Sequence, residues 1–245
     1  MPNTTQYSST LLQLCTGLFL AAASSIASAS LTVTSVIGGA PAGVKYVNLD
    51  NLDLGAAGGT SNGVIVEFGG AAGPDGSKIV QGSEVNKYAA PYISNSNGVL
   101  FGDSTVSGPN TTKYVTTHWQ GTVTFTLPEA SRYFGLLWGS VDSTIFTNTL
   151  TFLDADGNSV GSINGTDVGA SANGDQGALG TYYVNINSTD TFTKVVMSGN
   201  FFEADNIAYN ATVPVPEAST YAMFLAGLGV LGVVARKKSR KTTSL

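Results

Sequence analysis

Two acidic side chains near the end of the chain have a spacing that could support shared chemistry. Glu203 and Asp205, in the stretch FFEADNIAY, are separated by one residue. If this stretch is a β-strand, both carboxyl groups project from one face, about 7 Å apart. Such a pair can act on a glycosidic bond, bind a calcium ion, or accept hydrogen bonds from water or a neighbouring loop. We expect the structural use, with calcium as the alternative, and no enzymatic activity.

Two stretches fit the G-x-S-x-G pattern of a serine nucleophile, GTSNG at 59–63 and GNSVG at 157–161. That motif requires a strand before the serine, a helix after it and, in α/β-hydrolases, a histidine further along the chain. The single histidine, His118, precedes Ser159, and neither stretch is followed by a predicted helix. The sequence therefore does not favour a serine hydrolase.

A third pattern, DADGNS, resembles the start of a calcium-binding EF-hand loop through Asp154, Asp156 and Asn158. An EF-hand loop needs Gly at its sixth position and Glu at its twelfth. Those positions hold Ser159 and Gly165. We expect a hairpin turn between the flanking segments TLTFL and SVGSI.

Other residues with chemical potential are few. Trp119 and Trp138 could stack on sugar rings, but large aromatic residues in predicted strands favour the core. With Cys15 as the single cysteine and His118 as the single histidine, neither an intrachain disulfide nor a Cys/His zinc cluster can form. The sequence predicts no cofactor, with calcium as the only candidate.

The elements that must position these residues are predicted to be short strands. In residues 122–127 (TVTFTL), apolar residues alternate with threonines, the period of a half-buried strand. Further strands are predicted at 31–37, 63–68, 133–138, 149–153, 159–163, 182–186, 191–197 and 201–209. Residues 55–63 and 75–108 are expected to form long surface loops. The pattern predicts an all-β fold, an antiparallel sandwich of the jelly-roll kind.

Charge is distributed unevenly along the chain. Five of the 11 Lys and Arg lie in residues 236–241, whereas 15 of the 16 Asp and Glu lie in residues 30–212. The body is thus more acidic than the formal net charge of -5 indicates. Phosphates would repel such a surface, so we expect no nucleic-acid partner.

The N-terminal segment has the features of a signal peptide. Residues 11–23, LLQLCTGLFLAAA, form an apolar stretch with the length of a signal-peptide core. Ala27 and Ala29, on either side of Ser28, form the small-residue site that signal peptidase requires. The sequence therefore predicts a signal helix within residues 1–29, cleavage after Ala29 and a mature N-terminus at Ser30.

The C-terminal segment has the features of a short membrane span. Residues 221–235 carry no charge, and a helix begun at Ala218 would be about 27 Å long, against a hydrocarbon core of about 30 Å. Basic side chains follow at once, and the positive-inside rule places them in the cytoplasm: Arg236, Lys237, Lys238, Arg240 and Lys241. Pro214 and Pro216 predict an extended spacer before this transmembrane helix.

This segment resembles a known sorting signal, the PEP-CTERM motif. The resemblance rests on a Pro-Glu motif, a short hydrophobic helix and a basic cluster, in that order; the motif residues are Val215, Pro216, Glu217, Ala218 and Ser219. It implies export in a Gram-negative bacterium that makes exopolysaccharide. It also implies that exosortase, a membrane-embedded cysteine protease, recognises and cleaves residues 213–245.

The body also resembles a domain that recurs in exosortase-sorted surface proteins, through LLWGSVD at 136–142, NTLTFLDADGNSVGS and FFEADNIAYN. This resemblance implies one β-sandwich over residues 30–212. We expect a membrane-anchored precursor, then a cell-surface or extracellular matrix protein with a structural or interaction role. A carbohydrate-binding module, with or without calcium support, is the first alternative. A glycoside-active enzyme is the second.

Overall fold

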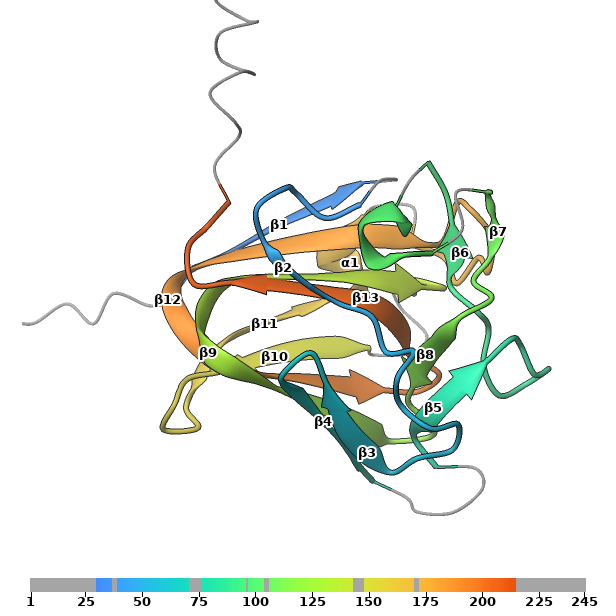
Figure 1. Ribbon diagram of the computed structural model, residues 1–245, viewed down its shortest axis with the longest axis horizontal. Coiled ribbons are helices and arrows are strands. Elements are labelled where there is room, and N and C mark those ends of the chain that lie inside the picture. Colours follow the sequence, from blue (N-terminus) through green and yellow to red (C-terminus); the bar gives the residue numbers. More distant parts are fainter. Residues whose placement is uncertain are drawn as a thin grey trace, which may run out of the picture.

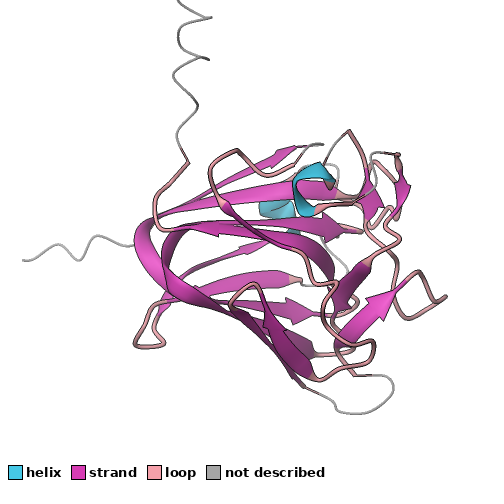
Figure 2. Cartoon of the chain, viewed as in Figure 1, coloured by secondary structure: helices cyan, strands magenta, loops and turns pink. Residues whose placement is uncertain are grey.

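The computed structural model describes residues 30–36, 39–70, 76–95, 97–103, 106–142, 148–169 and 172–214. Within these ranges the protein consists of strands and loops, with one 3-10 turn and one four-residue helix (Figure 2). The predicted all-β class is confirmed. The predicted signal helix with Ala27 and Ala29, and the predicted transmembrane helix at 221–235, lie outside the described residues. In the described part of the chain, no helix combines the length and the apolar character needed to cross a membrane.

The strands are short except for two. Their bounds are β1 Leu31–Val36, β2 Lys45–Val47, β3 Gly58–Ser61, β4 Val64–Gly69, β5 Lys78–Gln81, β6 Tyr92–Ile93, β7 Gly108–Pro109, β8 Lys113–Thr116, β9 Gly121–Gly139, β10 Thr149–Leu153, β11 Ser159–Asn164, β12 Tyr182–Gly199 and β13 Glu203–Asn210. The helical turns are η1 Val99–Phe101 and α1 Gly165–Val168.

Eleven of these strands form one antiparallel sheet with the central order β11-β10-β12-β9-β13-β8-β5. β1 pairs with β12, β2 with β13, β4 with β9 and β3 with β4, while β6 and β7 pair with each other. β9 and β12 therefore form the middle of the sheet. Figure 1 shows both as long ribbons that curve around one side of the molecule.

β9 runs continuously where the sequence predicts two strands, 122–127 and 133–138. Pro128 lies inside β9, although proline cannot donate a hydrogen bond to a ladder. The structure tolerates Pro128 because the β9–β12 ladder is interrupted between Thr126 and Ser131. β12 likewise joins the strands predicted at 182–186 and 191–197, with shifts in register between Asn187 and Lys194.

The bend brings the two halves of β9 onto a shared core. The rings of Phe125 and Phe134, one from each half, lie 6.1 Å apart, and Phe134 also contacts Phe152 of β10 at 6.0 Å. Val123 and Phe125 are fully buried, which confirms the alternation seen in the sequence. Burying side chains of this size contributes about 1.5–3 kcal/mol each.

The two segments predicted as long surface loops also contain strands, so that prediction is wrong in part. Residues 55–63 include β3, which pairs with β4, and residues 75–108 include β5, which pairs with β8. The second segment also buries Ile93 and Phe101. β3 begins with two glycines, so it shows no apolar alternation in the sequence. Glycine is required at position 58 because a Cβ there would lie 2.5 Å from the Val66 carbonyl oxygen of β4.

Candidate functional site

Glu203, the first residue of β13, is buried, with 1% of its surface exposed. The backbone N–H of Ala89 donates to Glu203 Oε1 at 3.2 Å, and Ser140 Oγ donates to Oε2 at 2.6 Å. Burial raises the pKa of Glu203 to about 8, although these two hydrogen bonds act to lower it. Glu203 therefore joins the loop before β6 to the turn after β9.

Asp205 is equally buried but has different neighbours. Asn110 Nδ2 donates to Asp205 Oδ2 at 2.6 Å, while Oδ1 has no hydrogen-bond partner. Burial, and then the charge of Asp103, hold the pKa of Asp205 well above its usual range. The structure excludes the solvated strand face considered for Glu203 and Asp205. Each carboxyl group instead accepts hydrogen bonds from a different neighbouring loop.

β13 has a local irregularity directly after Asp205. Asn206 has a φ of 54°, and the β13–β9 register shifts between Asp205 and Ala208. A bulge of this kind bends a strand and redirects its side chains, often next to functional sites. The first seven residues of β13 are all buried, whereas a half-exposed strand would alternate.

A cleft of about 730 Å³ lies beside the first residue of β13. Its walls come from the loop 83–89, the turn after β9, residues 173–176 and the segment before β13. Most of the lining side chains are polar or aromatic, among them Tyr88, Ser140, Asp142, Gln176, Phe201 and Glu203. Burial raises the pKa of Asp142 as well. The cleft therefore combines amide, carboxyl and aromatic groups, a mixture that suits a polar organic ligand.

Phe201 lines the cleft and contacts two further aromatic rings. The ring of Phe201 lies 6.4 Å from that of Trp119 and 5.4 Å from that of His118. Trp119 is 55% exposed, so its predicted place in the core is wrong. Phe201 has a φ of 53°, an uncommon conformation for a bulky residue and one that concentrates at functional sites.

Trp138, by contrast, lies in the core as predicted. It is fully buried and stacks on Phe202 with 4.1 Å between ring centroids. Two consecutive residues of the segment that leads into β13 thus contact the two tryptophans. Phe201 contacts the exposed Trp119, and Phe202 contacts the buried Trp138.

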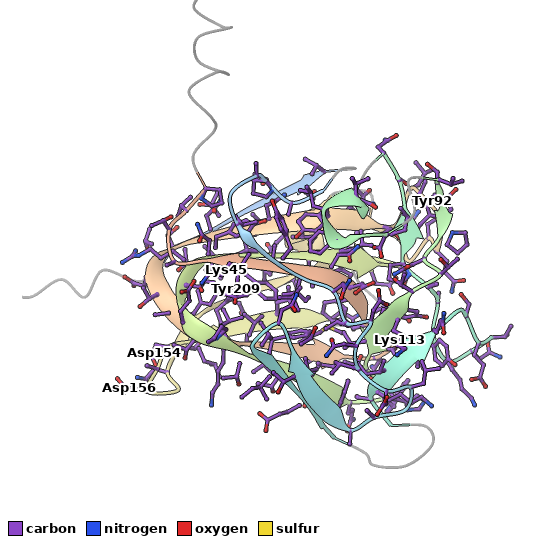
Figure 3. The ribbon with its side chains drawn as sticks, in the orientation of Figure 1. Lys45, Tyr92, Lys113, Asp154, Asp156 and Tyr209 are labelled. Atoms are coloured by element: carbon purple, nitrogen blue, oxygen red, sulfur yellow. The ribbon has the colours of Figure 1, made fainter. Side chains whose placement is uncertain are left out.

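The remaining sequence motifs have structural roles. Asp154 and Asp156 lie in the exposed hairpin turn between β10 and β11 (Figure 3), as predicted. Asp154 Oδ1 accepts the backbone N–H groups of Asp156 and Asn158 at 2.9 and 2.8 Å. Of the two serines in G-x-S-x-G patterns, Ser61 is buried and donates to the Asn48 carbonyl, and Ser159 begins β11.

Sequence reasoning missed most of the groups around the two carboxyls. Ser140, Ala89 and Asn110 lie in turns or loops distant in sequence from β13. These three residues belong to no recognisable sequence motif, and only the fold brings them close to Glu203 and Asp205.

Comparisons with known proteins identify one segment of the chain. The family model for the PEP-CTERM protein-sorting motif matches residues 214–241. No curated protein matches the chain significantly. Among solved structures, the chain is similar to the enzymatically active domain of bacteriophage CBA120 tailspike protein 4, with 14% identity and a TM-score of 0.24. That similarity covers 61% of this chain and 19% of the tailspike chain, and it is too weak to support an argument on fold or function.

The matched residues begin at Pro214, the last described residue of the body. They contain the predicted sorting motif and basic cluster in full, although both lie outside the described residues: Val215, Pro216, Glu217, Ala218, Ser219, Arg236, Lys237, Lys238, Arg240 and Lys241. The motif implies processing by exosortase, and with it export through a membrane-anchored precursor. The chain is a protein with a PEP-CTERM sorting motif, carried by residues 214–241.

Proposed function

We propose that this protein is a cell-surface or extracellular matrix protein of an exopolysaccharide-producing Gram-negative bacterium, with a structural or interaction role. The sorting motif carries the proposal, because it follows directly on a well-packed β body. Signal peptidase would cleave after Ala29, and exosortase would cleave the tail while residues 221–235 lie in the inner membrane. The body would then be displayed or released as a unit.

We infer that this body is a single sandwich of the jelly-roll kind, built by one sheet bent over itself. The contact of Phe134 with both Phe125 and Phe152 supports this inference. Such a body folds by burial and hydrogen bonding, without a disulfide. It suits a protein whose surface, rather than a reaction, provides the function.

We expect no glycosidase activity, although three carboxyl groups line the cleft, those of Glu84, Asp142 and Glu203. Both oxygens of Glu203 are held by hydrogen bonds to Ala89 and Ser140, so neither is free to protonate a glycosidic oxygen. Burial raises the pKa of Asp142 as well as that of Glu203. A glycosidase instead keeps one carboxyl group as an acid and the other ionised. The hydrogen bond from Lys87 lowers the pKa of Glu84, but that carboxylate is held in an ion pair with Lys87 at 2.6 Å.

The sorting proposal is tested by expressing the chain in two strains of one exopolysaccharide-producing host, with and without exosortase. In the first strain the body is expected at the surface or in the medium, without its tail. In the second the tailed form is expected to remain in the inner membrane. The same distribution and size in both strains would contradict the proposal.

The aromatic residues Trp119 and Phe201 support a second function, carbohydrate binding. Phe201 lines a cleft with amide and carboxyl groups, and its ring contacts that of Trp119, which is 55% exposed. Aromatic rings pack well on the apolar faces of sugars. The test is gel retardation of the purified chain by exopolysaccharide from the same host. Trp119→Ala and Phe201→Ala should abolish retardation, while Leu54→Ala, an exposed apolar control, should preserve it. Equal retardation of all four proteins would contradict this function.

A further inference from the structure

A group of side-chain oxygens lies between β13 and the segment that leads into β8. We call it the oxygen cluster; its members are Asp103, Asn110, Thr112, Asp205 and Asn206. Thr112 Oγ1 lies 2.6 Å from Asn110 Oδ1, 3.3 Å from Asp103 Oδ1 and 3.5 Å from Asp205 Oδ2. A threonine hydroxyl has one hydrogen, so it can donate to only one of these three acceptors at a time.

Two further oxygens of the cluster, Asp205 Oδ1 and Asn206 Oδ1, have no hydrogen-bond partner of normal geometry, although the backbone N–H of Asn206 lies near enough to the Asp205 carboxyl group to act to lower its pKa. The two residues are 1% and 0% exposed. Each amide NH2 group of the cluster donates to a carboxyl oxygen: Asn110 Nδ2 to Asp205 Oδ2, and Asn206 Nδ2 to Asp103 Oδ2, both at 2.6 Å. Buried acceptors without partners are rare in native proteins and indicate an additional ligand or water.

The cluster also lacks a compensating positive charge among the described residues. Asp103 and Asp205 form no ion pair there. Lys113, labelled in Figure 3, follows the cluster in sequence, but its ammonium group donates to the carbonyl oxygens of Asp50 and Leu52 at 2.8 and 2.6 Å. Two carboxylates within one largely buried site are costly without a cation.

We propose that the oxygen cluster binds a calcium ion, with Asp103 and Asp205 as charged ligands and Asn206 Oδ1 as a neutral ligand. Calcium takes six to eight oxygen ligands from carboxylates, amides and water in flexible geometry. No three acidic, His or Cys side chains converge on one point in the described ranges. Amide, hydroxyl and water oxygens must therefore complete the coordination shell.

The Asn206 amide lies beside the Asp103 carboxyl group. Its Nδ2 donates to Asp103 Oδ2 at 2.6 Å, and its Oδ1, bonded to the same amide carbon, has no partner. Asn110 Oδ1 and Thr112 Oγ1, which lie 2.6 Å apart, form the adjacent wall of the cluster.

Calcium at this point would join elements that are distant in sequence. Asp103 follows η1, while Asp205 and Asn206 belong to the bulge in β13. The positive φ of Asn206 turns a strand residue toward the same cluster as its neighbour. The inference does not depend on the sorting route or on carbohydrate binding.

Binding is tested on the full chain in detergent, stripped with EDTA and titrated with calcium chloride by calorimetry. We expect one site, with a dissociation constant of about 10⁻⁵ to 10⁻³ M, between the weakest sensor sites and extracellular calcium modules. Magnesium should bind more weakly, because it demands octahedral geometry and gives up water reluctantly. Terbium should give tyrosine-sensitised emission, since Tyr114 precedes Val115, the residue of β8 that pairs with Ala204 beside Asp205.

Asp103→Asn and Asp205→Asn should each weaken calcium binding at least tenfold and abolish the rise in melting temperature that calcium gives the parent. Asp156→Asn, in the exposed hairpin turn, is the control and should bind as the parent does. Melting curves in EDTA show whether each variant is folded. Asp103 is only partly buried, so Asp103→Asn should disturb folding less than Asp205→Asn. No calcium heat from the parent, or equal affinity in Asp103→Asn and the parent, would overturn the proposal.

Discussion

At the scale of single residues, Glu203 shows how a buried carboxyl group can be structural. Glu203→Gln retains the shape and an acceptor for the Ala89 N–H, so its free energy of unfolding should stay within about 1 kcal/mol of the parent. Glu203→Ala leaves a cavity and two polar groups without partners, which should cost about 2–4 kcal/mol. Denaturant unfolding at one fixed pH measures both. Equal stability of the Ala and Gln variants would contradict the structural role.

Asp142, in the cleft, gives a prediction on pH. Burial raises its pKa above the ordinary value of 3.8, so the folded state binds this proton more tightly than the unfolded state. The contribution of Asp142 to stability is therefore fully present below pH 3.8 and is lost as pH rises through the folded pKa. The stability of the parent minus that of Asp142→Asn should decrease from pH 3 to pH 7. A difference that increases over this range would show that the ionised form is favoured.

At the scale of elements, the glycine-rich strand β3 is held by a close backbone approach. Gly58 has a φ of 145°, and a Cβ there would lie 2.5 Å from the Val66 carbonyl oxygen. Gly58→Ala should therefore destabilise the protein by about 2–4 kcal/mol through strain and displacement of β4. Gly108→Ala, where a Cβ meets nothing within 4 Å, should cost under about 1 kcal/mol. Thermal unfolding compares the two, and similar losses would refute the close approach.

The strands differ in how well they can be predicted from the sequence. Alternation in residues 122–127 and 149–153 predicts strands well, because one face of each is buried in the core. Strands β3 and β5 give weaker patterns, since backbone pairing at an edge requires no alternation. Pro128 suggests a break that the structure avoids by leaving a gap in the ladder.

The candidate sites are less visible in the sequence than the strands. The spacing of Glu203 and Asp205 suggests that they form a pair, but the two carboxyl groups have different hydrogen-bond partners. Their partners lie about a hundred residues away, at Ala89 and Asn110, in segments without regular patterns. The burial of the whole of β13 depends on β2, β8 and β9 together, which no local pattern encodes.

At the scale of the whole molecule, the body and the tail make separate contributions. The tail carries the sorting motif. On the proposed route, its five basic residues at 236–241 would hold the tail on the cytoplasmic side, since moving each charge across hydrocarbon costs several kcal/mol. Replacing those five residues with Gln should let the precursor pass uncleaved, and Glu217→Ala should leave it uncut in the membrane. Glu129→Ala, on the surface of the body, is the control and should be sorted normally. Fractionation with antibodies to the body measures all three, and normal sorting of the two tail variants would contradict this role.

The central claim is that both ends of the chain are removed during export. The most direct measurement is the intact mass of the protein recovered from the cell surface or medium of a host with exosortase, together with its terminal peptides. The account predicts an N-terminus at Ser30 and a C-terminus near Pro216 and Glu217, with residues 221–245 absent. A surface protein that begins at Met1, or that retains the basic cluster at 236–241, would contradict it.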